Sequence, residues 1–396
     1  MAARANLTFL GQEDIELSSD PQVTYFVEKY QGQTLFTSRV IRVQQPTDPG
    51  IVFGTERYID IPNIGDLVTK MYLKIRVPDE YIDAVSVIDS TGTLALDFVE
   101  LYVGSQLIER ISGEFISMKY DVEVPTSKQG TLSAMIGKTG NSPTAVNSSY
   151  TIPLPFSILE KGLPLCAIQQ QITFRAKTNP SSLFIYPGNP DVEPSLPLTA
   201  ELHCEYTYIS DEEIRYIRSK PQIYLFQQLQ LEEYFASQGT TNVVCQLDFT
   251  NPVSELYFVI QNDSALGYDY GLEAYIDPDT GEYTQGTSDQ LSFLTLLFNG
   301  TDRISVEVGT PLFLRVIQGL EFHTRVPDGL FYMYSFSLDP ESPAPTGHVN
   351  FSRIKNQVLN INLVANDHNR YIRIYAVSYN FLLIQDSDAI LMFPNS

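Results

Sequence analysis

Residues 334–340 read Tyr334-Ser335-Phe336-Ser337-Leu338-Asp339-Pro340, and residues 345–354 read Pro345-Thr346-Gly347-His348-Val349-Asn350-Phe351-Ser352-Arg353-Ile354. The first stretch begins with the aromatic residues that strands favour and ends at a proline, which stops a strand. The second stretch is a proline and glycine turn followed by a polar segment that contains one aromatic residue. Neither stretch matches a nucleophile, phosphate-binding or metal-binding motif. The pair therefore predicts architecture rather than chemistry.

Composition favours two all-β domains. The chain has 396 residues, which is long for one ordinary domain, and its 43% hydrophobic content is enough to bury full cores. Its aromatic residues are 24 Tyr and 22 Phe with no Trp, and 24 Pro and 23 Gly interrupt short apolar runs. This composition is typical of proteins built from many short strands and turns.

The net charge argues against nucleic acid as a partner. The chain carries 25 basic and 47 acidic residues, for a formal charge of −22. Binding to a nucleic-acid backbone requires clustered Lys and Arg that replace condensed counterions. Since no basic cluster is present, we expect no direct contact with nucleic acid.

Alternation with a period of two recurs along the chain and predicts antiparallel sheets with one buried face. Apolar residues alternate with polar ones in three clear runs: Val99, Leu101 and Val103; Leu359, Ile361 and Leu363; Ile372, Ile374 and Ala376. Turns are also marked. Asn299-Gly300 predicts a type I′ hairpin, and residues 103–106 predict a turn at a similar place in the first half.

One helix is predicted between two repeated halves. Ser210 and Glu213 form a capping box, the first turn is acidic, and Pro221 ends the segment. Residues 202–209 resemble residues 374–381, and residues 97–110 resemble residues 294–303. We expect an N-terminal arm at 1–20, a first domain at 21–210, a linker helix at 211–221 and a second domain at 222–396.

Catalytic or metal-binding sites are poorly supported. The four His and three Cys show no metal-ligand spacing, and no nucleophile or phosphate-loop motif occurs. Residues 277–282 faintly resemble a calcium loop, but a hairpin turn is the better interpretation. We therefore predict no enzyme activity and no cofactor. An acidic β-sandwich enzyme acting on carbohydrates, or a lectin, remains the alternative, since a glycosidase needs only two placed carboxylates.

No signal peptide is expected, because the N-terminus turns acidic immediately, and no apolar run is long enough to span a membrane. The sequons are therefore not expected to be modified in the secretory pathway. Asn147, Asn262 and Asn299 are candidates for another route of glycosylation on outer loops.

The opening stretches resemble a signature of the major capsid proteins of nucleocytoplasmic large DNA viruses, including those of algal viruses and iridoviruses. The residues that carry this signature are Tyr334, Ser335, Phe336, Pro340, Gly347, Asn350, Phe351, Ser352 and Arg353. Further segments are similar to this family in the family's own order: residues 20–26, 65–67, 99–101, 152–156, 205–209, 221–230, 247–249, 297–300 and 375–380. The chain is short for this family, so we expect short surface loops at about 125–149 and 263–290.

The resemblance implies an all-β fold of two tandem eight-stranded jelly-roll sandwiches joined by a short helix. It also implies a structural role in the virion: three copies form a pseudo-hexagonal capsomer, and capsomers tile an icosahedral shell. The implied partners are further copies of the chain, penton and minor capsid proteins, and proteins bound to an internal membrane. Synthesis in the host cytoplasm is implied as well.

Overall fold

The computed structural model describes residues 20, 26, 32–43, 51–79, 82, 85–140, 142–180, 183–186, 199–277 and 279–393. The chain divides into two compact units, Met1–Leu35 and Phe36–Ser396. Apart from Asp20, the arm expected at residues 1–20 lies outside the described residues. The second unit contains the sheets and helices of both halves.

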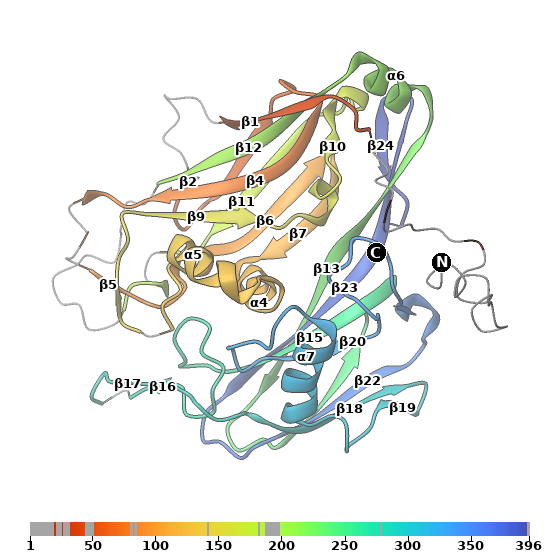
Figure 1. The fold of residues 1–396 in the computed structure, drawn as a ribbon. Helices are drawn as coiled ribbons and strands as arrows, with labels where there is room; N and C mark the ends of the chain where they lie inside the picture. Colours follow the sequence, from red (N-terminus) through yellow and green to blue (C-terminus); the bar gives the residue numbers. More distant parts are fainter. Residues whose placement is uncertain are drawn as a thin grey trace, which may run out of the picture. The chain divides into compact units, whose positions relative to one another are not determined.

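The first half is a sandwich of two antiparallel sheets (Figure 1). Sheet 1 follows the order β1-β12-β4-β10, with β2 paired to β12 and β9 paired to β4. Sheet 2 follows the order β3-β11-β6-β7. The strands of sheet 1 are β1 (Phe36–Arg42), β2 (Ile51–Val52), β4 (Leu67–Arg76), β9 (Ser149–Leu154), β10 (Leu163–Pro164) and β12 (Thr199–Ile209). The strands of sheet 2 are β3 (Glu56–Ile61), β6 (Leu96–Val103), β7 (Gln106–Ser112) and β11 (Ile172–Thr178).

The second half repeats this plan. Sheet 3 follows the order β13-β23-β15-β20, with β21 paired to β15 and β24 paired to β23, and sheet 4 follows the order β14-β22-β18-β19. The strands of sheet 3 are β13 (Gln222–Ala236), β15 (Pro252–Asn262), β20 (Tyr332–Ser335), β21 (Val349–Asn350), β23 (Arg370–Gln385) and β24 (Asp388–Leu391). The strands of sheet 4 are β14 (Asn242–Leu247), β18 (Leu291–Phe298), β19 (Thr301–Ile304) and β22 (Gln357–Leu363).

A shared irregularity supports the internal repeat. The pairing of β12 with β4 shifts by one residue at Thr69, and the pairing of β23 with β15 shifts in the same way at Ser254. Each bulge residue donates its hydroxyl to a carbonyl on the neighbouring strand, Thr69 to Glu205 at 3.3 Å and Ser254 to Val377 at 3.1 Å. Because a bulge re-aims the strand that carries it, the two sheets bend at equivalent places.

The predicted helix between the halves is confirmed as α6 (Asp211–Ser219), and Ser210 Oγ accepts a hydrogen bond from Glu213 N at 3.4 Å. The predicted hairpin at Asn299-Gly300 is also confirmed, since both residues have positive φ angles, 52° and 82°. A second hairpin joins β16 (Tyr275–Ile276) to β17 (Tyr283–Thr284), as the turn interpretation of residues 277–282 predicts.

Further helices were not predicted. They include α3 (Thr91–Leu94), α4 (Gly113–Glu123), α5 (Thr126–Ile136), and a continuous helical segment made of η6 (Leu312–Ile317) and α7 (Gln318–Phe322). The surface loop expected at about residues 125–149 contains a helix, α5. α5 has few buried residues and no strong apolar stripe, so its pattern gives little signal of a helix. Among the described residues, no helix has the length and apolar character needed to cross a membrane.

The two sandwiches have separate cores, but the first core extends beyond its own half. It contains Tyr257, Tyr375 and Val377 from the outer face of sheet 3, together with Leu382 and Ala389 near the end of the chain. The inner face of sheet 3 belongs to the second core. Sheet 3 is therefore buried on both faces over part of its area, and the contact along its outer face is called the seam below.

One glycine on α4 and one on α5 test how tightly each helix is packed against its surroundings. An added Cβ at Gly113 would lie 2.2 Å from the carbonyl oxygen of Thr93 and 2.3 Å from that of Leu96, whereas at Gly130 it would meet nothing within 4 Å. We expect Gly113→Ala to lower the free energy of unfolding by about 2 kcal/mol or more. Gly130→Ala should raise it by roughly 0.5–1 kcal/mol. Urea denaturation measures both, and equal effects would contradict the packing.

Candidate functional site

The seam is formed mainly by α4, which belongs to the first sandwich and packs on the outer face of sheet 3 (Figure 1). Ser112 caps this helix by accepting a hydrogen bond from Phe115 N, which places the Phe115 ring at its start. That ring meets Tyr257 edge-on at 5.4 Å between centroids and lies 5.8 Å from Tyr375. Aromatic pairs in this geometry add to the free energy gained by burying their area.

A buried ion pair lies beside this aromatic contact. Glu114 on α4 accepts hydrogen bonds from both Nε and Nη2 of Arg373 at 2.7 Å, and it also accepts from the hydroxyls of Tyr270 and Tyr375. Gln261 accepts a further bond from Arg373 Nη2 at 2.6 Å. Burial alone would lower the pKa of Arg373, but the charge of Glu114 raises it above its ordinary value. The pair is therefore charged and links the two sandwiches.

His323 and two carboxylates form a second cluster of charged side chains. His323 Nε2 lies 2.6 Å from Glu255 and its Nδ1 lies 3.2 Å from Glu341, and the imidazole is almost fully buried. Burial lowers the pKa of His323, but the two carboxylates outweigh it and raise the pKa to about 10. Across the seam, burial raises the pKa of Glu123 to about 7 although Lys119 opposes this shift.

Glu109 is another buried carboxyl group of this region, 4% exposed. It accepts hydrogen bonds from the amides of Ser157 at 2.9 Å and Ile158 at 3.2 Å. Burial nevertheless raises its pKa to about 8. Since Glu109 and Glu123 keep a proton near neutral pH more readily than an exposed carboxyl does, the seam region gains stability on acidification.

The C-terminal hairpin holds the far end of the seam. Asp386 and Ser387 form a turn with positive φ angles that starts β24. Ala389 N then donates to Gln170 at 2.9 Å and Leu391 N donates to Gln106 at 3.0 Å, and both acceptors belong to the first sandwich. The last strand of the chain is therefore bonded to both halves.

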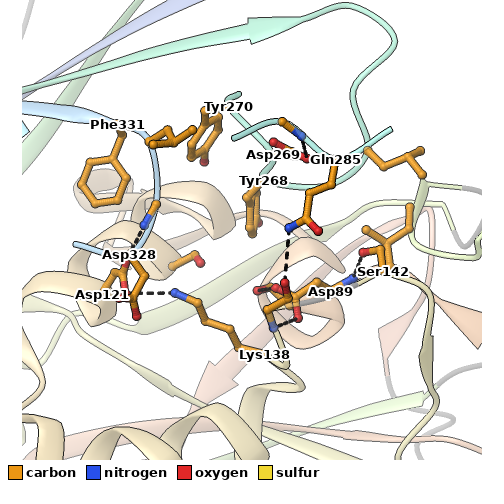
Figure 2. Close-up of a pocket in the computed structure, with 18 of the residues that line it drawn as sticks. Asp89, Asp121, Lys138, Ser142, Tyr268, Asp269, Tyr270, Gln285, Asp328 and Phe331 are labelled. Atoms are coloured by element: carbon orange, nitrogen blue, oxygen red, sulfur yellow. Dashed lines mark hydrogen bonds and ion pairs between the residues drawn. The ribbon is translucent and has the colours of Figure 1, made fainter. Parts of the chain in front are cut away.

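A cavity of about 240 Å³ opens at the other end of the seam. Figure 2 shows Tyr268, Tyr270 and Phe331 of the second half on one side and charged groups of the first half on the other. Lys138 Nζ lies 3.0 Å from Asp121, whose carboxylate is also 3.5 Å from Arg325.

The charged groups of this cavity already have partners. Asp89 accepts hydrogen bonds from the amides of Thr139 and Gly140, and Gln285 Nε2 donates to the carbonyl of Gly140 from the second half (Figure 2). Among the residues that the structure describes, no group of three or more His, Cys, Asp and Glu side chains could hold a metal ion. The cavity thus shows a bonded joint between the halves rather than a set of groups ready for catalysis.

The signature residues lie together at one end of the second sandwich. Phe351 is fully buried, and its ring contacts those of Phe249, Phe298 and Phe336 at centroid distances of 6.2, 5.2 and 5.8 Å. Tyr334 meets Phe336 edge-on at 5.2 Å. These aromatic residues close the end of the second core.

The polar signature residues shape the turn around that cluster. Ser335 is buried; its amide donates to Gln318 and its hydroxyl to the carbonyl of Ser337, both at 2.8 Å. Gly347 has a φ of 151°, and a Cβ there would lie 3.0 Å from the carbonyl oxygen of Phe336. Pro340 is buried, and the next residue, Glu341, contacts His323.

Three signature residues, Asn350, Ser352 and Arg353, are exposed. The Ser352 hydroxyl accepts a hydrogen bond from Asn251 N at 2.8 Å. The signature thus combines a buried aromatic cluster with a short exposed surface, and it reaches the charged groups around His323 through the turn at Pro340 and through Ser335, which pairs with Glu255.

One glycosylation candidate is wrong. Asn262 is 2% exposed, and its side-chain amide donates to the carbonyls of Leu272 and Ala274 at 3.0 and 2.8 Å. A glycan on that nitrogen would need space and a free donor that this site lacks. Asn147 and Asn299 are exposed.

Sequence reasoning missed the seam. Glu114 and Arg373 are 259 positions apart, and no motif joins them. The only local signal was Ser112 before a helix that the sequence analysis did not recognise. The burial of His323 between two carboxylates likewise depends on the tertiary fold and follows from no motif.

Two family models together match most of the chain. The model described as major capsid protein N-terminus matches residues 24–190, and the model described as large eukaryotic DNA virus major capsid protein matches residues 213–389. The first match lies within the first sandwich and ends before β12, and the second begins inside α6 and runs through most of the second sandwich.

Individual capsid proteins are also similar to the chain over most of its length. The chain is 26% identical to the major capsid protein of Pyramimonas orientalis virus, over 98% of both chains. It is 22% identical to the major capsid protein of Costelytra zealandica iridescent virus, over 84% of this chain and 81% of the relative. Among solved structures, a subunit of the PBCV-1 virus capsid superposes with a TM-score of 0.81 at 21% identity, over 94% of this chain and all of the other. The predicted double jelly roll is thereby confirmed.

The first prediction from the seam concerns the buried ion pair. Arg373→Leu leaves Glu114 charged and without its cation, and we expect the free energy of unfolding to fall by about 3–5 kcal/mol. Replacing both residues with Leu should recover part of this loss, because no unpaired charge remains. Arg353→Leu, at an exposed arginine, is the control and should change stability by less than about 0.5 kcal/mol. Urea denaturation of the wild type, the two single Leu variants at Glu114 and Arg373, and the double variant gives the coupling energy, and Arg353→Leu is measured beside them.

The second prediction concerns pH. His323 contributes stability that is fully present below about pH 6.5, its ordinary pKa, and is lost as the pH rises through about 10. Glu109 and Glu123 hold protons in the folded state that the unfolded chain releases. They too therefore make the free energy of unfolding fall as the pH rises, up to about pH 8. The unfolding free energy should therefore fall between pH 6 and pH 9.5, by up to about 1.4 kcal/mol per pH unit for each proton.

His323→Gln should flatten this slope above about pH 6.5, the ordinary histidine pKa. His368→Gln is the matched control, since His368 stacks on Tyr275 outside the seam. A wild-type stability that rises between pH 6 and pH 9.5 would contradict the assignment.

Proposed function

The chain belongs to the family of major capsid proteins of large eukaryotic DNA viruses, and from this premise we propose that three copies form a pseudo-hexagonal capsomer that tiles an icosahedral shell. The protein forms the viral capsid and associates with itself; it is a structural protein and not an enzyme. The homotrimer and its outline are the proposal.

One observation supports the trimer above all. Each chain supplies two sandwiches of the same strand order, held side by side by the seam. Three copies then supply six similar lobes, and six lobes around one axis give the outline that packs without gaps on a flat facet. Contacts between such tiles can be individually weak, because each tile has several neighbours.

The domain limits are part of the proposal: an arm at residues 1–20, a first jelly roll at 21–210, a linker helix at 211–221 and a second jelly roll at 222–396. The second family match begins at residue 213, at the start of the proposed linker, which supports a domain boundary near this position. Both sandwiches nevertheless fall in one compact unit, since the seam joins them over a large buried area.

The partners beyond the trimer are neighbouring capsomers, penton and minor capsid proteins, and proteins of an internal membrane. Direct genome binding is excluded from the proposal because the net charge is −22. Synthesis takes place in the host cytoplasm, and Asn147 and Asn299 are the sites where outer loops could carry glycans. The signature residues keep the end of the second jelly roll in one shape, so that it can meet the same surface in every copy.

Light scattering on the purified chain tests the proposal. We expect a mass close to three times the 44.6 kDa of one chain, and three-lobed, six-cornered particles in negative-stain micrographs. A protein that stays monomeric across a range of salt and pH, or forms twofold dimers, would refute the trimer. A monomer that becomes a trimer only with a second protein from infected cells would instead show that assembly needs a chaperone.

A further inference from the structure

We propose that the helical segment at residues 312–322 docks on the outer face of sheet 1 in a second copy of this chain, in the way that α4 docks on sheet 3 within one chain. The inference rests on the proposed function and specifies which surfaces meet. It follows from comparing the two sandwiches position by position.

The two helical segments are equivalent. Each follows the hairpin of its own sandwich, β6–β7 for α4 and β18–β19 for residues 312–322. Ser112-Gly-Glu-Phe-Ile116 aligns with Thr310-Pro-Leu-Phe-Leu314. Ile116 and Leu314 are both fully buried in their own cores, so the alignment also holds in three dimensions. It places Phe313 where Phe115 lies in α4.

The receiving sheets are equivalent too. Within a chain, Phe115 lies against a cross-strand pair of residues, Tyr257 on β15 and Tyr375 on β23. Counting from the shared bulges, the matching pair on sheet 1 is Tyr72 on β4 and His203 on β12. The outer face of sheet 1 thus offers a ring platform at the place where sheet 3 has one.

The helical segment is uncovered, whereas α4 is not. Leu312 is 64% exposed and Leu320 is 72% exposed. Leu312 begins the wider π-helical part of the segment (Leu312–Ile317) and Leu320 lies in the α-helical part, so their spacing of eight residues is about two turns and places them on one side. Their equivalents in α4 are covered: the Glu114 side chain is 11% exposed and Val122 is fully buried. Large exposed apolar side chains on one face indicate a missing partner.

Charge decides which surfaces can pair. Arg373, which holds Glu114, corresponds on sheet 1 to Glu201, and Glu201 is bound by Arg42 and Arg76 at 3.3 Å each. If α4 approached sheet 1, Glu114 would lose the bidentate arginine that Arg373 provides and would meet a carboxylate already paired with two arginines. The 312–322 segment has Leu312 at that position, so it needs no such partner. This arrangement favours docking of residues 312–322 on sheet 1 and disfavours docking of α4 on the same face.

The surroundings are also complementary. Four basic residues lie on the outer face of sheet 1 against two acidic ones, in a chain that is otherwise acidic: Arg42, Lys70, Lys74 and Arg76 against Glu201 and Glu205. Exposed Glu307 and Glu321 flank the apolar face of the helical segment. A contact between unlike surfaces is heterologous, which suits a closed ring of copies.

Two substitutions test the helical side. Leu312→Lys and Leu320→Lys should each raise the concentration at which the oligomer dissociates about tenfold or more, because each puts a positive charge against a basic face where an apolar side chain is buried. Val244→Lys is the matched control, since Val244 is 63% exposed but lies on β14 of sheet 4. It should leave dissociation unchanged. Sedimentation velocity measures assembly, and circular dichroism confirms that each variant is folded.

Cross-linking tests the pairing itself. Leu312→Cys and Glu201→Cys are made as separate proteins, mixed, and treated with a short bismaleimide. We expect a covalent dimer only in the mixture, because each contact joins one helix to one sheet. Each variant alone, and the wild type with its own three cysteines, should give none.

The outcomes separate this inference from the proposed function. A wild-type chain that is monomeric would refute the trimer and this inference together. A wild-type trimer whose assembly resists both Leu substitutions would overturn only the docking surface. Cross-links within Leu312→Cys alone would do the same, since they would show a twofold contact between like surfaces.

Discussion

The structure depends on one constraint: sheet 3 must be covered on both faces. Its inner face packs in the second core, and much of its outer face receives α4 from the first sandwich. The Glu114–Arg373 pair fixes the position of α4, because a bidentate pair tolerates little sliding. Without this cover, Tyr257, Tyr375 and Val377 would face water. The two jelly rolls therefore act as one body, although the sequence repeats one plan twice.

Divergence between the repeats has a clear direction. The bulges at Thr69 and Ser254 and the buried Ile116 and Leu314 remain equivalent, so the frame of each sandwich is the same. The outer faces differ: sheet 3 presents aromatic residues and an arginine, whereas sheet 1 presents charged groups around Glu201. The bulges and core positions are therefore equivalent in the two halves, whereas the residues on the outer sheet faces differ.

The sequence predicted the parts of the fold that depend on local pattern. Alternating residues such as Leu359, Ile361 and Leu363 do lie on a strand with a buried face, and the capping box at Ser210 does start a helix. α4 and α5 were missed because their apolar residues do not form a clean stripe. α4 in particular is buried on two sides, so its pattern resembles neither a surface helix nor a strand. The seam could not be predicted at all, since it joins residues that are distant in sequence, and Asn262 was misjudged because a sequon does not report burial.

The last strand of the chain has a consequence for the order of events during synthesis. Leu382, Ile384 and Ala389 are part of the core that the first sandwich shares, and β24 is bonded to Gln106 and Gln170. Translation must therefore pass residue 391 before the first sandwich can bury all of its apolar surface, although the last strand of that sandwich ends at Ile209. Until then, the part of this surface that β24 covers stays open to water.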